Sequence, residues 1–182
     1  MKFTPLPIPG AFLVEAKWAE DDRGRFTTFF DAEAFREQGL CVEWALFSSA
    51  SNRRRGILRG LHHQAAPHEE TKFVSCARGA IFDVIVDLRE DSPAYLSWTS
   101  LELRADTGVS LYIPKGCAHG YQVLEDGSEV KYLISAPYHP ELQRGLRWDD
   151  PLLAIRWPLP EIVQLSARDK ALPFVDAMRK SR

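Results

Sequence analysis

Short hydrophobic runs bounded by turn residues recur through the middle of the chain. Each run is rich in β-branched or aromatic residues, which favour extended backbone, and glycine, proline or aspartate separates consecutive runs. Short strands joined by tight turns are typical of β-barrels and β-sandwiches. The pattern therefore predicts consecutive antiparallel strands over residues 73–77, 80–88, 97–103 and 109–114.

Helical signals are confined to two short segments. Asp31 can cap the start of residues 31–39 and Gly39 can end them, which predicts one short helix. Ser166 and Asp169 have the spacing of a capping box, which predicts a second helix near the C-terminus. We find no linker, repeat or low-complexity tract, so residues 1–182 are expected to form a single, mainly β domain with short helical additions.

Composition and charge restrict the class of function. The 182 residues are 45% hydrophobic and 26% charged, as in ordinary soluble globular proteins. A net charge of −2 gives no general attraction to nucleic acid or to an anionic membrane, and no apolar run approaches the ~18 residues of a membrane span. Cys41, Cys76 and Cys117 are widely spaced and odd in number, as expected of reduced thiols in a cytoplasmic protein; a catalytic cysteine is the open alternative.

Residues 59–64, of sequence RGLHHQ, hold the densest candidate chemistry. Histidine exchanges protons near neutral pH, and arginine suits phosphate oxygens. The segment follows a basic run at residues 53–55, which is either part of a phosphate site or a solvated loop. A proton-transfer group beside a phosphate site indicates an enzyme acting on a phosphorylated or nucleotide-linked small molecule. Because adjacent strand residues point to opposite faces, His62 and His63 cannot both face a barrel interior.

A second motif, Gly108-x5-Pro114-x-Gly116-x2-His119, has the spacing of the second motif of the cupin double-stranded β-helix, a jelly-roll barrel. The first cupin motif supplies metal ligands as His-x-His followed by Glu. The corresponding place here reads HHQ, and Gln64 is a poor ligand where the second histidine should stand. We therefore expect a cupin fold without a metal site.

Motifs from about Asp22 to Pro173 resemble, in order, those of the dTDP-4-dehydrorhamnose 3,5-epimerase family. They are RGLHHQ (59–64), Lys72, GAIFDV (79–84), YIPKG (112–116), AHG (118–120), EVKY (129–132), APY (136–138), RWDDP (147–151) and SARD (166–169). The resemblance implies epimerisation of a nucleotide-linked 4-keto-6-deoxy sugar without a cofactor. It also implies a homodimer, in which roughly the first 20 residues form an arm that reaches the partner; a frayed terminus is the open alternative.

The resemblance implies four catalytic residues. His62 would remove the acidic proton beside the sugar carbonyl, while Asp169 would fix its tautomer and stabilise the imidazolium. Tyr132 would return a proton to the opposite face of the enolate. Lys72 would place a positive charge near the oxyanion that develops at O4. The helix cap is a second reading of Asp169, and one carboxylate can serve both roles.

The resemblance also implies a set of substrate-binding residues: Arg23, Phe26, Arg59, His119, Tyr138 and Asp83. Arg23 and Arg59 would contact the diphosphate, and Tyr138 would stack on the nucleobase. Asp83 lies within an apolar strand, where a charged group needs a partner. Lys72 or His62 is the expected partner.

Several positions depart from the family pattern. Phe47 and Ser49 stand where the family usually has a glutamine and an asparagine that contact substrate, Thr28 replaces a glutamate, and His63 replaces a tyrosine. These departures leave open the nucleotide (dTDP, CDP or GDP) and whether C3, C5 or both are epimerised. Three other functions also stay open: a cupin ketoisomerase, a non-catalytic sugar-nucleotide-binding module and a metal-dependent cupin oxygenase.

Overall fold

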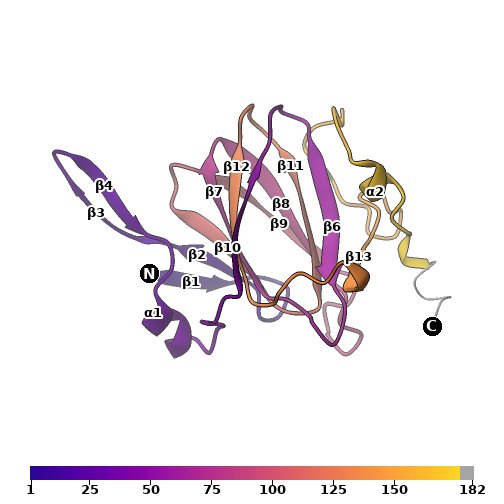
Figure 1. Ribbon diagram of the computed structural model, residues 1–182, viewed down its shortest axis with the longest axis horizontal. Helices are drawn as coiled ribbons and strands as arrows, with labels where there is room; N and C mark the ends of the chain where they lie inside the picture. The colour runs from indigo at the N-terminus through magenta and orange to yellow at the C-terminus, as the bar shows by residue number, and fades with distance from the viewer. Residues whose placement is uncertain (177–182) are drawn as a thin grey trace.

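The protein, described by a computed structural model over residues 1–176, is built mainly of antiparallel β-strands (Figure 1). The strands are β1 (Lys2–Pro5), β2 (Phe12–Glu15), β3 (Lys17–Asp21), β4 (Gly24–Thr28), β5 (Leu46–Ser51), β6 (Leu58–Gln64), β7 (Lys72–Arg78), β8 (Ala80–Asp87), β9 (Trp98–Arg104), β10 (Val109–Ile113), β11 (Cys117–Val123), β12 (Glu129–Ile134) and β13 (Gln143–Gly145). One sheet has the order β1-β2-β10-β7-β12-β5 and the other β13-β6-β11-β8-β9, while β3 and β4 pair separately. The predicted cupin jelly roll is confirmed.

The strands predicted from the hydrophobic runs are present as β7 to β10, each within one residue of its expected ends. Their inward side chains meet those of β11 and β12 between the two sheets. The largest buried cluster contains Val74, Ile81, Ile85, Leu103, Leu111, Tyr121 and Val130, and so joins both sheets. Burial of this apolar surface stabilises the barrel.

The outer face of the five-stranded sheet is covered by the C-terminal part of the chain. Leu61, Val84 and Val86 pack there against Leu146 and Leu153. This cover brings the short helix α2 (Ala167–Lys170) next to β6, as seen at the right of Figure 1. Ser166 caps α2, since its Oγ accepts a hydrogen bond from the Asp169 amide at 3.0 Å. The predicted cap is confirmed, and it orients Asp169 toward β6.

Helix α1 (Ala32–Glu37) lies against the six-stranded sheet. Asp31 caps it by accepting hydrogen bonds from the amides of residues 33 and 34, as predicted. Its one buried residue, Phe35, makes edge-to-face contacts with Phe3, Phe73 and Tyr112. Aromatic packing therefore fixes the N-terminal strands to the barrel. A short 3-10 helix, η1 (Pro140–Leu142), precedes β13.

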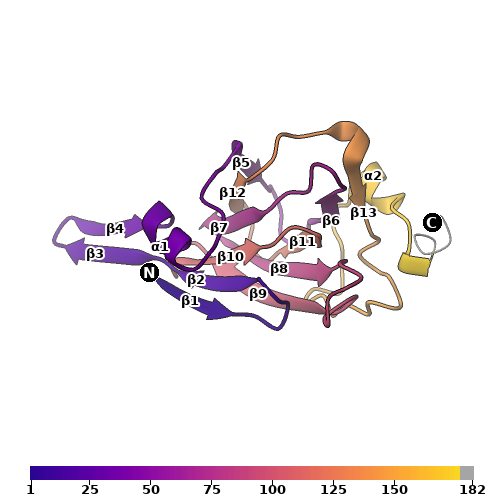
Figure 2. The same cartoon turned by 90° about the horizontal axis from the view of Figure 1, so that it is seen from below.

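The N-terminal region divides into two parts. β1 and β2 pair with each other, and β2 continues the chain's own sheet through β10. The β3–β4 hairpin instead projects away from the barrel (Figures 1 and 2) and exposes Trp18 and Phe26, which are 55% and 75% accessible. Most of the expected arm of about 20 residues therefore pairs within its own chain, whereas the hairpin, residues 17–28, begins near the end of that arm and extends beyond it. Over residues 1–176, no helix is both long and apolar enough to cross a membrane.

Candidate active site

A cavity of about 620 Å³ opens between the two sheets at one end of the barrel. It is lined by β5, β6, β7, β11 and β12 and by the start of α2. The lining includes four predicted site residues that belong to different elements: His62, Lys72, Tyr132 and Asp169. Arg59, His119 and Tyr138 line it as well. The structure therefore gathers seven of the sequence-predicted site residues around one space.

His62 and Asp169 form a hydrogen-bonded pair at the cavity wall. The Nε2 atom of His62 lies 2.6 Å from Oδ1 of Asp169, and the Gly60 amide donates to the other carboxylate oxygen at 3.4 Å. Burial alone would raise the pKa of Asp169, but the hydrogen bond and charge of His62 outweigh it and hold that pKa below its usual value. Asp169 is thus an anion that orients the ring. It also keeps its place in the helix cap, so its two expected roles coexist.

Close packing of β6 against β11 places His62. A Cβ at Gly60 would lie 2.7 Å from the Cα of Gly120 and from the carbonyl oxygen of His119, and Gly60 has φ of +109°. Only glycine fits this backbone approach and conformation. His62 stands directly opposite His119 in the strand register, so both rings point into the barrel.

His63 and Gln64 lie away from this chemistry. His63 points to the other side of β6, as the alternation predicted, and lines a separate cavity of about 220 Å³. Desolvation, then the charge of Lys72, lowers the pKa of His63 to about 4, so the ring is neutral at neutral pH. Gln64 is buried and binds the carbonyl oxygens of His68 and Pro137 at 2.6 and 3.0 Å. Gln64 therefore holds together the loops on the Tyr138 side of the site.

Lys72 forms an ion pair that the sequence did not predict. Its Nζ lies 2.9 Å from Oε1 of Glu70, and the two side chains are only 10% and 8% accessible. The same Nζ donates to the backbone carbonyl oxygen of His62 at 3.4 Å. Glu70 thus holds the ammonium at the cavity floor, close to the strand that carries His62.

The predicted partners of Asp83 were wrong. Its Oδ1 lies 2.5 Å from Nε2 of His119, rather than beside Lys72 or His62. Asp83 is fully buried and lies behind His119 rather than on the cavity wall. The reason is strand register: the regular pairing of β8 with β11 places Asp83 opposite Tyr121, and His119 lies two residues earlier on the same face, one diagonal step from Asp83. Lys72 belongs to the opposite sheet and already has a carboxylate.

Tyr132 faces His62 across the cavity, because it comes from β12 in the six-stranded sheet and His62 from β6 in the other. Its ring packs edge-to-face on His119 at 6.1 Å between centroids. Burial, then the neighbouring Tyr121 and Asp83, raises the pKa of Tyr132 well above its usual value. Tyr132 therefore keeps its proton until a strong base takes it.

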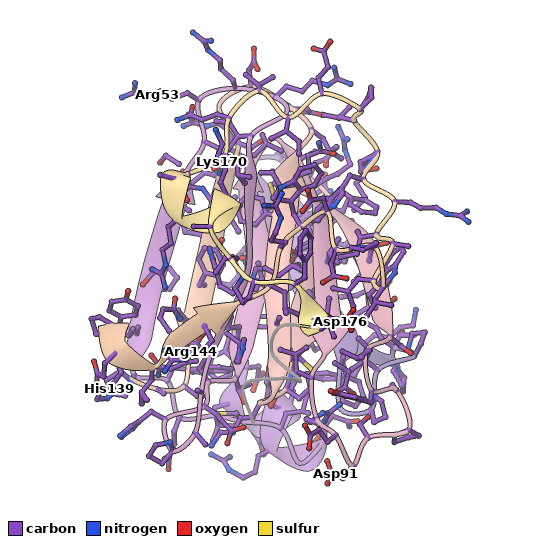
Figure 3. All side chains as sticks on the ribbon, turned by 90° about the vertical axis from the view of Figure 1, so that its right-hand side faces the viewer. Arg53, Asp91, His139, Arg144, Lys170 and Asp176 are labelled. Atoms are coloured by element: carbon purple, nitrogen blue, oxygen red, sulfur yellow. The ribbon has the colours of Figure 1, made fainter. Side chains whose placement is uncertain are left out.

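The cavity rim is positively charged. Arg53, Arg59 and Arg168 line it, whereas its two carboxylates, Glu70 and Asp169, are each paired. Figure 3 shows Arg53 toward one end of the molecule, with Lys170, the last residue of α2, near it. His139 lies lower on the same side, and its neighbour in sequence, Tyr138, lines the cavity. Such a rim favours an anionic ligand that extends toward an exposed aromatic ring. Of the basic run, Arg54 and Arg55 do not line the cavity.

Arg23 and Phe26 are not brought to the cavity of their own chain. Both lie on the β3–β4 hairpin, where Arg23 pairs with Asp21 at 2.6 Å. Among the departures from the family pattern, Phe47 is 72% accessible and lies outside the cavity. Ser49 does line the cavity, but its hydroxyl donates to Glu129 at 2.7 Å.

Sequence reasoning missed several lining or supporting residues: Asn52, Glu70, Tyr121, Gln164 and Arg168. Asn52 is buried, and its Oδ1 accepts from Nε of Arg59 at 2.8 Å and from the hydroxyl of Tyr121 at 3.3 Å. For two of these residues, the sequence spacing to a predicted site residue was a usable signal. Glu70 stands two residues before Lys72, and Tyr121 is two residues after His119, so on regular strands each would share a face with its neighbour.

The structure supports a catalytic cysteine or a bound metal less well than it supports proton transfer by His62 and Tyr132. Desolvation raises the pKa of Cys76 to about 11 and that of Cys117 to about 12, so both thiols stay protonated at neutral pH. Within residues 1–176, no three His, Cys, Asp or Glu side chains are grouped as metal ligands.

Comparison with known proteins connects this site to a family. Residues 5–177 match the family model described as dTDP-4-dehydrorhamnose 3,5-epimerase. A curated relative of that name from Sinorhizobium fredii is 38% identical over 173 residues, covering 95% of this chain and 89% of the relative.

Two solved structures also share the fold. A 4-keto-6-deoxy sugar epimerase from the novobiocin biosynthetic gene cluster of Streptomyces spheroides aligns with a TM-score of 0.95 and 33% identity, over 100% of this chain and 90% of that one. A 3'-monoepimerase from Streptomyces bikiniensis, in complex with dTDP-quinovose, aligns with a TM-score of 0.91 and 32% identity, over 97% and 89% of the two chains. The chain therefore belongs to the dTDP-4-dehydrorhamnose 3,5-epimerase family of isomerases.

Proposed function

We propose that the protein epimerises a dTDP-linked 4-keto-6-deoxy sugar at C3, C5 or both, with His62 as the base and Tyr132 as the acid. One observation carries the proposal: the paired imidazole and the phenol face the same cavity from opposite sheets. Inversion at carbon requires removal of a proton from one face and its return to the other. Two proton-transfer groups on opposite walls supply that arrangement.

In the first step, His62 removes the proton from a carbon beside the sugar carbonyl. The C–H electrons form the enolate, and the proton goes to His62. Asp169, whose low pKa keeps it anionic, stabilises the imidazolium across 2.6 Å. The negative charge moves to O4 of the sugar, where the ammonium of Lys72 would stabilise it.

In the second step, Tyr132 gives its proton to the enolate carbon from the opposite face. A phenol whose pKa is raised by burial is a weak acid, so it protonates only a strong base such as the enolate carbon. This selectivity favours protonation after the enolate has formed.

The rest of the substrate would extend toward the rim. Arg59 would bind the diphosphate in the geometry fixed by its bond to Asn52, with Arg53 and Arg168 adding positive charge. Tyr138, exposed at the rim, would stack on the nucleobase. The relative solved with dTDP-quinovose supports thymidine as the nucleoside.

The test is solvent exchange. The protein is incubated in heavy water with 4-keto-6-deoxyglucose linked to dTDP, CDP or GDP, and deuterium at C3 and C5 is followed by mass spectrometry and NMR. We expect labelling to be fastest with the dTDP-linked sugar. A 3,5-epimerase would place label at both carbons, and a single-site enzyme at one. Treatment with a chelator should not lower the rate. Folded protein that labels none of the three would disprove the proposal.

We also propose that the protein acts as a homodimer in which the β3–β4 hairpin completes the partner's cavity. The hairpin carries the two family-implied binding residues that do not reach the cavity of their own chain, Arg23 and Phe26. Its exposed Trp18 and Phe26 give it apolar surface to bury against a second chain. Arg23 would then bind the diphosphate of the partner's substrate.

Mixed dimers test this arrangement. We expect Arg23→Ala/Phe26→Ala and His62→Ala each to be nearly inactive alone, and their co-expression to restore about 25% of the wild-type rate, since half of random dimers then hold one intact site of two. Co-expression of His62→Ala with Asp169→Asn is the matched control and should give no rate beyond that of the Asp169→Asn sites it contains, because both changes lie in the cavity. No recovery in the first pairing would contradict a hairpin acting across the dimer.

A further inference from the structure

We propose that Tyr121 is a positioning residue that moves its single hydroxyl hydrogen from Asn52 to Tyr132 when Tyr132 gives up its proton. The inference rests on the proposed function, and it assigns Tyr121 a role in the second half of the reaction only. Tyr121 is 1% accessible, and its hydroxyl lies within hydrogen-bonding reach of the hydroxyl of Tyr132.

The strand register explains why the two phenols meet. Tyr121 on β11 stands between Arg59 on β6 and Asp83 on β8, and the three side chains form one row across the inner face of the sheet. Tyr132 approaches from the opposite sheet and packs, like Tyr121, against the ring of His119, with centroid distances of 6.1 and 6.2 Å. Tyr121 therefore comes from the same sheet as His62 and meets Tyr132, which comes from the opposite sheet, beside the ring of His119.

Tyr121 can give up its present hydrogen bond to Asn52 at little cost. Its hydroxyl donates to Oδ1 of Asn52 at 3.3 Å, a long bond, while Nε of Arg59 donates to the same oxygen at 2.8 Å. The side-chain nitrogen of Asn52 is held by the carbonyl oxygens of Ala50 and Ser128 at 3.2 Å each. If Tyr121 rotates its hydroxyl away, Asn52 keeps a donor to its oxygen, so no buried acceptor is left without a partner.

The reaction produces a charged oxygen on Tyr132 that the hydroxyl of Tyr121 can stabilise. When the O–H bond of Tyr132 breaks and a new C–H bond forms, a phenolate appears in a buried space near the carboxylate of Asp83, whose charge opposes it. The hydroxyl of Tyr121 can then donate to the phenolate oxygen. Tyr121 keeps its own proton throughout, and Tyr132 regains one from solvent after product leaves.

Tyr121→Phe tests the proposal by separating two readouts in heavy water. Formation of the inverted product requires Tyr132, whereas entry of deuterium into recovered substrate with unchanged configuration requires only His62. A hydrogen bond to a charged oxygen corresponds to about 10- to 100-fold in rate. We therefore expect inversion to fall by about that factor and exchange into recovered substrate to stay within about twofold of wild type.

Tyr112→Phe is the matched control. Tyr112 is also a buried tyrosine of the barrel, but its hydroxyl accepts a hydrogen bond from the Cys41 amide at 3.1 Å and lies outside the cavity. Both readouts should be unchanged in this variant. Equal loss of inversion and exchange in Tyr121→Phe, or no loss of inversion, would overturn the proposal while leaving the function intact. Absence of both reactions in the wild-type protein would instead overturn the proposed function together with it.

Discussion

Replacement of His62 by alanine is expected to abolish both exchange and inversion, with a fall in kcat of at least about 1,000-fold and no loss of fold. His62 is paired with the carboxylate of Asp169 at the cavity wall near α2, and its side chain is 28% accessible, so truncation removes the base without opening the buried core. Within residues 1–176, the other cavity imidazole, His119, is held by Asp83 at 2.5 Å on the tyrosine side. Among the described residues, no second imidazole is therefore placed to act as the base.

The adjacent histidine provides the control. His63→Tyr introduces the residue usual in the family at that place, on the other side of β6, and should retain wild-type exchange. Thermal unfolding and circular dichroism would confirm that both variants fold. Wild-type exchange in His62→Ala would show that another group is the base. Asp169→Asn should give an intermediate loss, because the base remains while its orientation and charge stabilisation weaken.

The fold was predictable wherever strands carried a continuous apolar signal. β7, β8 and β10 are largely buried between the sheets and carry aromatic or β-branched residues, so their sequence shows them directly. β5, with the sequence LFSSAS, and the exposed hairpin strands β3 and β4 carry no such signal. Their pairing with neighbouring strands defines them, and pairing depends on the tertiary structure.

The roles and orientations of the site residues could be predicted where they follow from sequence motifs or from the alternation of side chains along a strand. The opposite orientation of His62 and His63 follows from the period of a strand, and the cap of α2 from Ser166 and Asp169. The partner of Asp83 could not be predicted, because the register between β8 and β11 decides which side chains lie beside it, and that register is set by the fold. The contacts of Asn52 and Tyr121 join residues far apart in sequence, so they too required the fold.

Replacement of Lys72 by methionine is expected to have two separable effects. Loss of the positive charge at the developing oxyanion should lower kcat by about 100- to 1,000-fold. Loss of the buried ion pair should also lower the free energy of unfolding by roughly 3 kcal/mol, because Glu70, only 8% accessible, would be left without its cation. Urea unfolding and steady-state kinetics would measure the two effects.

Addition of Glu70→Gln separates these effects. In Lys72→Met/Glu70→Gln the buried charge is gone along with its partner, so the free energy of unfolding should return to within about 1 kcal/mol of wild type while kcat stays low. The exposed pair Lys2–Glu15, 71% and 42% accessible, is the control: Lys2→Met should cost less than about 1 kcal/mol and leave kcat unchanged. If the double variant recovers activity together with stability, then Lys72 serves the fold and not the oxyanion. If Lys72→Met alone keeps kcat within about threefold of wild type, the oxyanion must be stabilised elsewhere.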